Sequence, residues 1–163
     1  MTDLNTPERD TLARYLDRYR DVVRWKLQGV SEEDARRPMV PSGTSLLGVT
    51  QHLAYVERWW FQMVIAGDGV EFPGGEGDPD ADFRIEDDQT IRSVLDLYEA
   101  ECDRSREILG GLEDLDDVRE AHGSDVSLRR ILVHMVEEVA RHAGHMDIIR
   151  ELIDGQTGDF PED

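Results

Sequence analysis

Cysteine is nearly absent from this sequence of 163 residues, which holds only Cys102. A single cysteine cannot form a disulfide within the chain, and it cannot form a Cys-x-x-Cys zinc or redox site. Arg106, one helical turn further on, is the only basic residue near its inner face, which is weak support for a thiolate. We therefore expect Cys102 to pack in the core and not to act as a nucleophile.

Long apolar runs and basic charge are also lacking. No apolar stretch approaches the roughly 20 residues that span a bilayer, and the first residues, MTDLNTPERD, lack the basic and apolar regions of a signal peptide. Only one of the 18 basic residues is a lysine, Lys26, and 37 acidic residues bring the formal net charge to −19. Such an acidic surface repels nucleic acids and anionic lipids. We expect a cytoplasmic protein that binds neither nucleic acid nor membrane.

Apolar residues make up 39% of the chain, enough for a hydrophobic core, and the length suits one domain over residues 1–163. Four segments carry apolar residues at three- and four-residue steps, the period of an amphipathic helix. They run from Pro7 to about Val30, from a start within residues 41–45 to about Ala66, from near Asp88 or Thr90 to Gly110, and from near Ser127 to Asp154. The sequence therefore predicts an all-α four-helix bundle without a sheet, and a frayed tail at residues 156–163.

Residues 67–89, here called the acidic segment, are rich in glycine, proline and acidic residues. The segment contains nine acidic residues and five glycines, and Arg84 is its only basic residue. Its length exceeds that of most loops in compact domains, which indicates a lid or a mobile surface segment. We expect it to be mobile, to supply no metal ligand and to contribute little to holding the core together.

The last predicted helix carries three side chains that can bind a metal. At about 100° per residue, Glu138 lies roughly 40° from His142 on the helical wheel, and His145 lies roughly 60° from it on the same side. His142 falls within the apolar stripe, and the other two fall at its edge. One histidine on an apolar face is usually a hydrogen-bonded core residue. Three such groups together favour a metal site, because charged groups are rarely buried unless they are paired or metal-bound.

His52 in the second predicted helix can complete such a site. It lies among apolar residues in the least charged helix of the chain, and metal sites in bundles are built from inward side chains of facing helices. His52 together with Glu138 and His142 would leave a coordination position open, as catalytic zinc sites do. Trp59 lies close to the His52 face and is a candidate for lining a substrate or cofactor pocket, although plain core packing explains it equally well.

Two stretches resemble the DinB/YfiT-like superfamily of helical bundles. They are Ser45-Leu-Leu-Gly-Val-Thr-Gln-His52-Leu53 in the second helix and Val136-Glu-Glu-Val-Ala-Arg-His142-Ala-Gly-His145-Met-Asp in the last. The strongest resemblance is to the actinobacterial branch that includes mycothiol-dependent S-transferases and maleylpyruvate isomerase. The spacing of the whole chain, from Leu12 to Gly155, is similar to that of the superfamily.

The resemblance implies a divalent metal, with zinc first and nickel or iron as alternatives, held by His52, Glu138 and His142. The isomerase branch is similar in having glutamate at the position of Glu138, where many relatives have histidine. His145 stands where relatives often have glutamine. A second ligand set, made of His52, His142 and His145, therefore stays open.

The chemistry that the resemblance implies is thiol activation. A metal lowers the pKa of a bound low-molecular-weight thiol such as mycothiol, and the thiolate attacks a small-molecule electrophile. The resemblance therefore implies a metal-dependent thiol transferase or isomerase, and a homodimer. The alternative is a non-catalytic metal-binding bundle that acts as a sensor or an interaction module.

Overall fold

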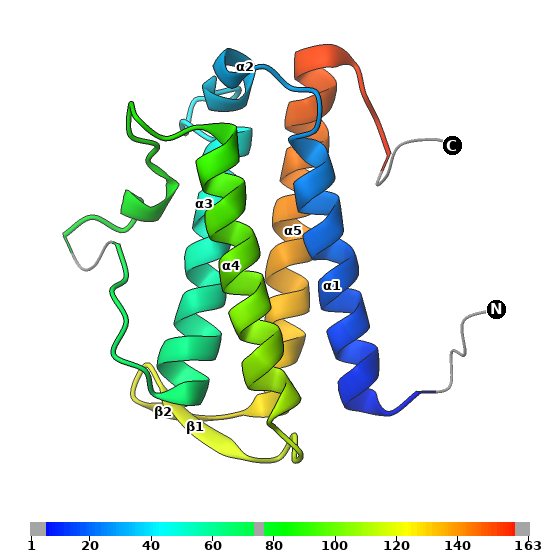
Figure 1. The fold of residues 1–163 in the computed structure, drawn as a ribbon, viewed down its shortest axis with the longest axis vertical. Coiled ribbons are helices and arrows are strands. Elements are labelled where there is room, and N and C mark those ends of the chain that lie inside the picture. Colours follow the sequence, from blue (N-terminus) through cyan, green and yellow to red (C-terminus); the bar gives the residue numbers. More distant parts are fainter. Residues whose placement is uncertain (1–5, 74–76, 159–163) are drawn as a thin grey trace.

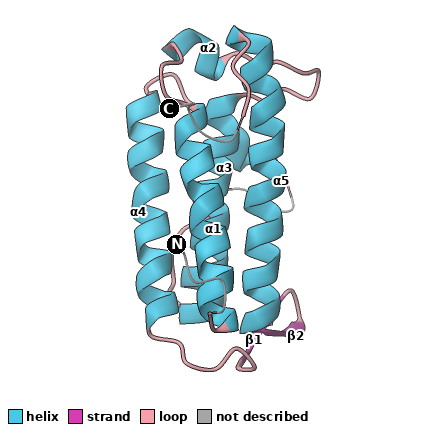
Figure 2. Ribbon diagram, turned by 90° about the vertical axis from the view of Figure 1, so that its right-hand side faces the viewer, coloured by secondary structure: helices cyan, strands magenta, loops and turns pink. Residues whose placement is uncertain are grey.

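The structure, a computed structural model, describes residues 6–73 and 77–158. More than half of the chain is helical, and four long helices pack along the longest axis of the molecule (Figure 1 and Figure 2). The helices are α1 (Glu8–Lys26), α2 (Glu32–Arg36), α3 (Leu46–Glu57) with its π-helical continuation η1 (Arg58–Ala66), the short 3-10 helix η2 (Ala81–Phe83), α4 (Ile91–Gly110) and α5 (Leu128–Asp154). The predicted all-α four-helix bundle is confirmed.

Short polar residues begin three of the long helices, and each is among the start residues that the sequence offers. The hydroxyls of Ser45, Thr90 and Ser127 each accept a hydrogen bond from the backbone N–H three residues further on. Glycines end two of these helices, since Gly67 after η1 and Gly155 after α5 have left-handed φ angles of 73° and 79°. Local sequence signals therefore set these boundaries.

The helices do not alternate in direction along the chain. In Figure 1, α1 and α5 run upward, whereas α3 and α4 both run downward. α1 packs on α5, and α3 packs on α4 and also contacts α5. Because α3 and α4 are parallel, the acidic segment must return along the bundle between them, which accounts for its length. Its helix η2 contacts α3 on the way.

The π-helical continuation of α3 shifts the buried face by one residue. A 3.6-residue period predicts Trp60 and Val64 on the inner stripe, but both are only half-buried, while Phe61 and Ile65 are buried. A π-helix closes i→i+5 hydrogen bonds in place of i→i+4, so each turn holds more residues. The residues that face the core therefore move further along the sequence than a regular helix predicts.

A short hairpin stands where the sequence predicts an irregular linker. The strand β1 (Val118–Ala121) pairs antiparallel with β2 (Ser124–Ser127), and His122 and Gly123 form the turn. Both turn residues have positive φ, 52° and 73°, as in the type I′ turns that suit hairpins. The expectation of no sheet is therefore wrong. The strands are four residues long and only Ala121 is buried, so they lack the apolar alternation by which strands are recognised.

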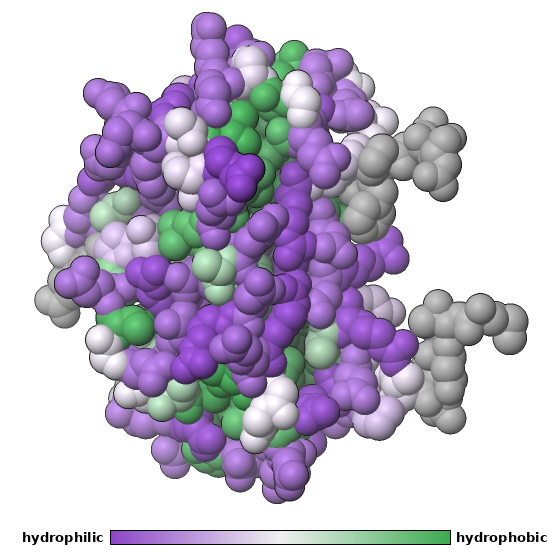
Figure 3. Space-filling model, in the orientation of Figure 1, coloured by the Kyte–Doolittle hydropathy of each residue, from purple (hydrophilic) through white to green (hydrophobic). Residues whose placement is uncertain are grey.

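The surface agrees with the acidic composition. Figure 3 shows a mostly hydrophilic face on which hydrophobic residues appear in separate patches. None of the helices in the described part of the chain is long and apolar enough to cross a membrane.

The only lysine of the chain is buried against the end of α5. Lys26 is 0% exposed, pairs with Asp147, and donates from Nζ to the backbone oxygen of Gly158 at 2.5 Å. This contact holds the backbone of Gly158 near the end of α1. The frayed tail over residues 156–163 stays a prediction. Residues 159–163 lie outside the described residues.

A buried ion pair joins α1 to α3. Arg20 donates from Nε and Nη2 to the two carboxylate oxygens of Glu57 at 2.8 and 2.6 Å, and both side chains are at most 2% exposed. Its remaining Nη1 donates to Asp17, which also accepts from Arg106 of α4. Burial lowers the pKa of Arg20, but attraction to Glu57 outweighs burial and raises it overall. Arg20 therefore stays charged in the core.

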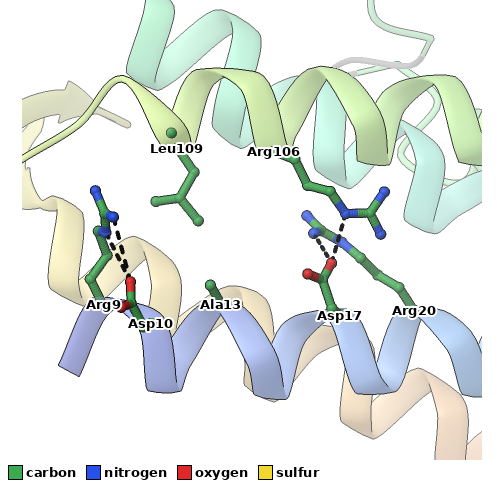
Figure 4. Close-up of a pocket in the computed structure, with 8 residues that line it drawn as sticks. Arg9, Asp10, Ala13, Asp17, Arg20, Arg106 and Leu109 are labelled. Atoms are coloured by element: carbon green, nitrogen blue, oxygen red, sulfur yellow. Dashed lines mark hydrogen bonds and ion pairs between the residues drawn. The ribbon is translucent and has the colours of Figure 1, made fainter. Parts of the chain in front are cut away.

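The outer end of this network borders a pocket of about 180 Å³ between α1 and α4 (Figure 4). Asp17 points between Arg20 and Arg106, and Arg9 at the other end pairs with Asp10. Each arginine of the pocket is thus already neutralised by an aspartate. Among the described residues that line the pocket, no cation is left unpaired to select an anionic ligand.

The Arg20–Glu57 pair generates the first prediction. Glu57→Gln keeps the shape of the side chain but leaves the Arg20 charge buried without its counterion, so we expect a loss of about 3–5 kcal/mol in the free energy of unfolding. Urea denaturation measures this loss. Arg92→Ala, which removes the exposed Arg92–Asp96 pair, serves as control and should cost no more than about 1 kcal/mol. Equal losses in the two variants would contradict the prediction.

Candidate metal centre

His52, Glu138 and His142 meet between α3 and α5. Each offers one ligand atom, and these atoms all lie within 4.8 Å of one another. Oε1 of Glu138 lies 3.4 Å from Nε2 of His52 and 3.1 Å from Nε2 of His142. The three side chains are between 11% and 17% exposed. The cluster is therefore largely buried but still in contact with solvent.

Helix geometry explains why these side chains meet. Glu138 and His142 are four residues apart, so they lie on one face of α5, one turn above the other. His52 lies in the second turn of α3, whose start is fixed by the Ser45 cap. Because α3 and α5 pack against each other, the inward faces of two helices supply all three groups.

The charge of the cluster favours the binding of a cation. Hydrogen bonds with His142 and then with His52 hold the pKa of Glu138 well below its usual range. Burial lowers the pKa of His52, but its hydrogen bonds with Asp82 and Glu138 outweigh burial, so the pKa is raised overall. An ionised carboxylate thus lies between two imidazoles, in the arrangement that a divalent cation would stabilise.

The donor set fits a divalent metal. Zinc binds imidazole nitrogen and carboxylate oxygen at about 2.0–2.2 Å, so two ligands of a tetrahedral site lie about 3.3–3.5 Å apart. The two separations from Oε1 of Glu138, 3.4 and 3.1 Å, are close to this spacing. Three protein ligands leave one position open, as catalytic sites require.

His145, the other metal ligand considered from the sequence, lies beside this group. Its ring meets the His142 ring edge-on with 5.4 Å between centroids, and its side chain is exposed. Burial and then repulsion by His142 and Arg141 lower the pKa of His145. The structure therefore brings three of the four predicted metal residues together, and its geometry favours Glu138 over His145 as the third ligand.

Trp59 lies in an aromatic group further along the helix from His52. Its ring packs edge-on against Phe72 of the acidic segment at 5.6 Å and stacks on His122 of the hairpin turn at 5.5 Å. Phe72 also meets Tyr55 edge-on. Trp59 thus links η1 to the acidic segment and the hairpin, and its role in lining a pocket stays a prediction.

The acidic segment packs on the metal cluster. Asp82 is buried, and its Oδ2 lies 2.6 Å from Nδ1 of His52. The Phe83 ring stacks on the His52 ring with 3.9 Å between centroids and 12° between planes. Gln51 of α3 donates from Nε2 to the carbonyl oxygens of Asp82 and Arg84 at 3.0 and 2.8 Å. Residues 82–84 therefore pack on α3, although the sequence predicts a mobile segment that contributes little to holding the core together.

The acidic composition of residues 67–89 does not predict these contacts. Asp82 is one acid among nine in the segment, and nothing in its neighbours along the chain marks it out. The available signal was Phe83 and Ile85, since a solvated loop rarely carries two large apolar residues two positions apart. Both pack against the hydrophobic core. Residues 74–76 of the segment lie outside the described residues.

Cys102 is buried in α4, as expected. Burial, followed by the negative charge of Glu57, raises the pKa of its thiol to about 12. The thiol therefore stays protonated at neutral pH and is a poor nucleophile.

The fold and the cluster together define a class of protein: a four-helix bundle with a candidate divalent metal centre between facing helices. Comparison with known proteins supports this class and narrows it. Residues 11–155 match the mycothiol-S-transferase family, which is a DinB/YfiT-like family. The chain belongs to this family, as the resemblance of its two motifs predicts.

A solved structure shares the fold. The chain is similar to a conserved protein from Enterococcus faecalis, with a TM-score of 0.70 and 16% sequence identity, over 93% of this chain and 99% of that one. At this identity the likeness shows the fold alone. A search of curated proteins found no match.

The raised pKa of His52 predicts how metal binding depends on pH. His52 must lose its proton to bind a metal, so metal affinity should fall as the pH is lowered through the pKa of His52, which lies above 6.5. Below that pKa the affinity should fall about tenfold per pH unit for each proton displaced. Competition for zinc against a chromophoric chelator measures the affinity. A flat profile down to pH values well below about 6 would contradict the prediction.

The contribution of His52 to the stability of the metal-free protein should change with pH in the opposite direction to metal affinity. A raised folded-state pKa contributes stability that is present below the unfolded pKa and lost as the pH rises through the folded pKa. In the presence of a chelator, the wild type should therefore lose stability relative to His52→Ala as the pH rises through this range. Melting curves of both proteins at several pH values measure the difference, and parallel curves would rule out the raised pKa.

Proposed function

We propose that this protein is a metal-dependent transferase that activates a low-molecular-weight thiol, mycothiol first, and joins it to a small electrophile. The observation that carries the proposal is the convergence of Nε2 of His52, Oε1 of Glu138 and Nε2 of His142 in a chain of the mycothiol-S-transferase family. We propose zinc as the metal, because imidazole and carboxylate ligands with one open position suit it. Nickel and iron accept the same ligands and are the alternatives.

Each residue of the cluster has a distinct role in this proposal. His52 and His142 would hold the metal through neutral imidazoles, and Glu138 would hold it through a carboxylate, which leaves the centre less positive than three histidines would. A divalent metal at this position lowers the pKa of a bound thiol and so supplies a thiolate at neutral pH. The buried, protonated Cys102 is consistent with this scheme, because the thiol cosubstrate provides the nucleophile.

The reaction balances without an oxidant or reductant. The sulfur of the thiol forms a bond to the electrophilic carbon, the leaving group departs with its electron pair, and the thiol proton passes to solvent. With a chlorodinitrobenzene as the electrophile, the carbon–chlorine bond breaks and chloride leaves. The product is an aryl thioether whose absorbance can be followed directly.

The test is turnover by the zinc-loaded protein with mycothiol and a chlorodinitrobenzene. We expect thioether formation above the rate of mycothiol alone, and removal of zinc by a chelator should abolish the excess. Glutathione in place of mycothiol tests the choice of thiol. Stoichiometric zinc without turnover would favour the alternative, a metal-binding bundle that acts as a sensor or interaction module.

Ligand variants test the site itself. His52→Ala and His142→Ala should each lose stoichiometric zinc and the excess rate, because two remaining ligands hold zinc poorly. Glu138→Ala should lose more zinc than His145→Ala if Glu138 is the third ligand. His134→Ala, a half-buried histidine on the same helix that packs on Trp60, is the matched control and should keep its zinc. Elemental analysis measures the metal, and full zinc in both ligand variants would refute the site.

A further inference from the structure

We propose that Asp82 is a positioning residue for the metal centre: its carboxylate fixes the ring of His52 so that Nε2 faces Glu138 and His142 with a free lone pair. This inference rests on the metal site proposed above. It assigns the acidic segment a role in orienting one of the metal ligands.

The hydrogen bond between Asp82 and His52 sets the tautomer. Ionised carboxylates only accept hydrogen bonds, and His52 faces two of them: Oδ2 of Asp82 lies 2.6 Å from Nδ1, and Oε1 of Glu138 lies 3.4 Å from Nε2. The shorter contact favours the proton of neutral His52 on Nδ1. In neutral His52 the other nitrogen, Nε2, then carries the lone pair. Nε2 is the atom that lies 3.4 Å from Oε1 of Glu138. Histidines that bind metals commonly donate their other N–H to such a partner, which fixes the ring and raises its basicity.

Asp82 is held in place by contacts to α3. Gln51, next to His52 in the chain, donates to the carbonyl oxygens on either side of Phe83, those of Asp82 and Arg84. Gly48, one turn before His52, lets the backbone of Phe83 approach so closely that an added Cβ would lie 2.6 Å from its oxygen. The Phe83 ring covers the face of the His52 imidazole. The same short stretch thus fixes the plane of the His52 ring and its proton.

The energetics of Asp82 also point to this role. Its Oδ1 is buried and, within the described part of the chain, has no hydrogen-bond partner. A buried polar atom without a partner costs free energy, so the packing of Asp82 is poor for stability by itself. The hydrogen bond to His52 is the interaction that its other oxygen makes.

His142 provides an internal comparison. Its Nδ1 is buried and also lacks a hydrogen-bond partner among the described residues. Its tautomer is therefore not fixed from the outer side, in contrast with that of His52. A change at Asp82 should reach His52 and leave the outer nitrogen of His142 unaffected.

The first experiment reads the tautomer in the metal-free protein. Long-range ¹H–¹⁵N correlation spectra, recorded above the pH at which His52 titrates, assign the protonated nitrogen of each histidine. We expect His52 to carry its proton on Nδ1 in the wild type and in Asp82→Asn, whose amide oxygen still accepts. In Asp82→Ala we expect the proton to move at least partly to Nε2. An unchanged His52 tautomer in Asp82→Ala would overturn the proposal.

The second experiment measures zinc affinity by competition with a chelator. Asp82→Ala should bind zinc about 10- to 100-fold more weakly than the wild type, the usual effect of removing such a partner, and Asp82→Asn should lose less. Asp80→Ala removes an exposed acid two residues earlier and controls for loss of segment charge, so it should bind as the wild type does. Equal affinity of Asp82→Ala and wild type would overturn the proposal while leaving the proposed function intact.

Failure of the Asp82 proposal and failure of the proposed function give different results. If the wild type takes up no zinc, the proposed function fails, and the tautomer measurement still decides the role of Asp82. If Asp82→Ala does not fold, Asp82→Leu carries both tests, because its side chain has a similar shape and accepts no hydrogen bond; wild-type affinity and an unchanged His52 tautomer in this variant would overturn the proposal. Asp82→Asn affinity equal to that of wild type, with the tautomer retained, would show that the hydrogen bond and not the charge supports His52.

Discussion

The contact between Arg20 and Glu57 is the constraint on which the arrangement of α3 depends. Glu57 is fully buried at the end of α3, and both of its oxygens accept hydrogen bonds from Arg20 of α1. A buried carboxylate cannot leave its counterion without a large cost, so this pair fixes the rotation of α3 about its axis. His52 is five residues earlier, which places it about 140° around the helix. With Glu57 turned toward α1, His52 points from another side of α3 toward Glu138 and His142 of α5.

The parallel arrangement of α3 and α4 has a direct effect on the site. A chain that must return along the bundle needs a long crossover, and this crossover passes over the outer face of α3. It brings Asp82 and Phe83 to His52, which lies 30 residues before Asp82 in the sequence. The metal cluster is thus built from two helices and supported by the connection that their topology requires.

Much of this molecule could be predicted from its sequence because the signals are local. Apolar stripes at helical spacing gave four helices, and hydroxyl caps and glycines gave most of their ends. The i, i+4 spacing of Glu138 and His142 predicts that both lie on one face of the helix. His52 followed from its place in a helix with little charge, which had to be covered on most sides.

The remaining features depend on contacts that are distant in the sequence. The π-helical turn after Glu57 changes which residues face the core, and a 3.6-residue pattern does not predict this change. The hairpin is too short and too exposed to show alternation. Asp82 can support His52 only because Gln51 and Gly48 allow the crossover to pack on α3. Gln51 and Asp82 are 31 residues apart in the sequence.

The burial of Lys26 has a consequence for the chemistry of the whole surface. Apart from the histidines, every other basic side chain in the sequence is an arginine, and the one ε-amino group is buried and donates to the backbone oxygen of Gly158. Acylating reagents, bifunctional amine cross-linkers and enzymes that modify lysine therefore meet a surface without a lysine side chain. Positive charge on this surface comes from guanidinium groups, which stay charged at all physiological pH values, so its charge pattern is fixed on the basic side and varies only through carboxylates and histidines.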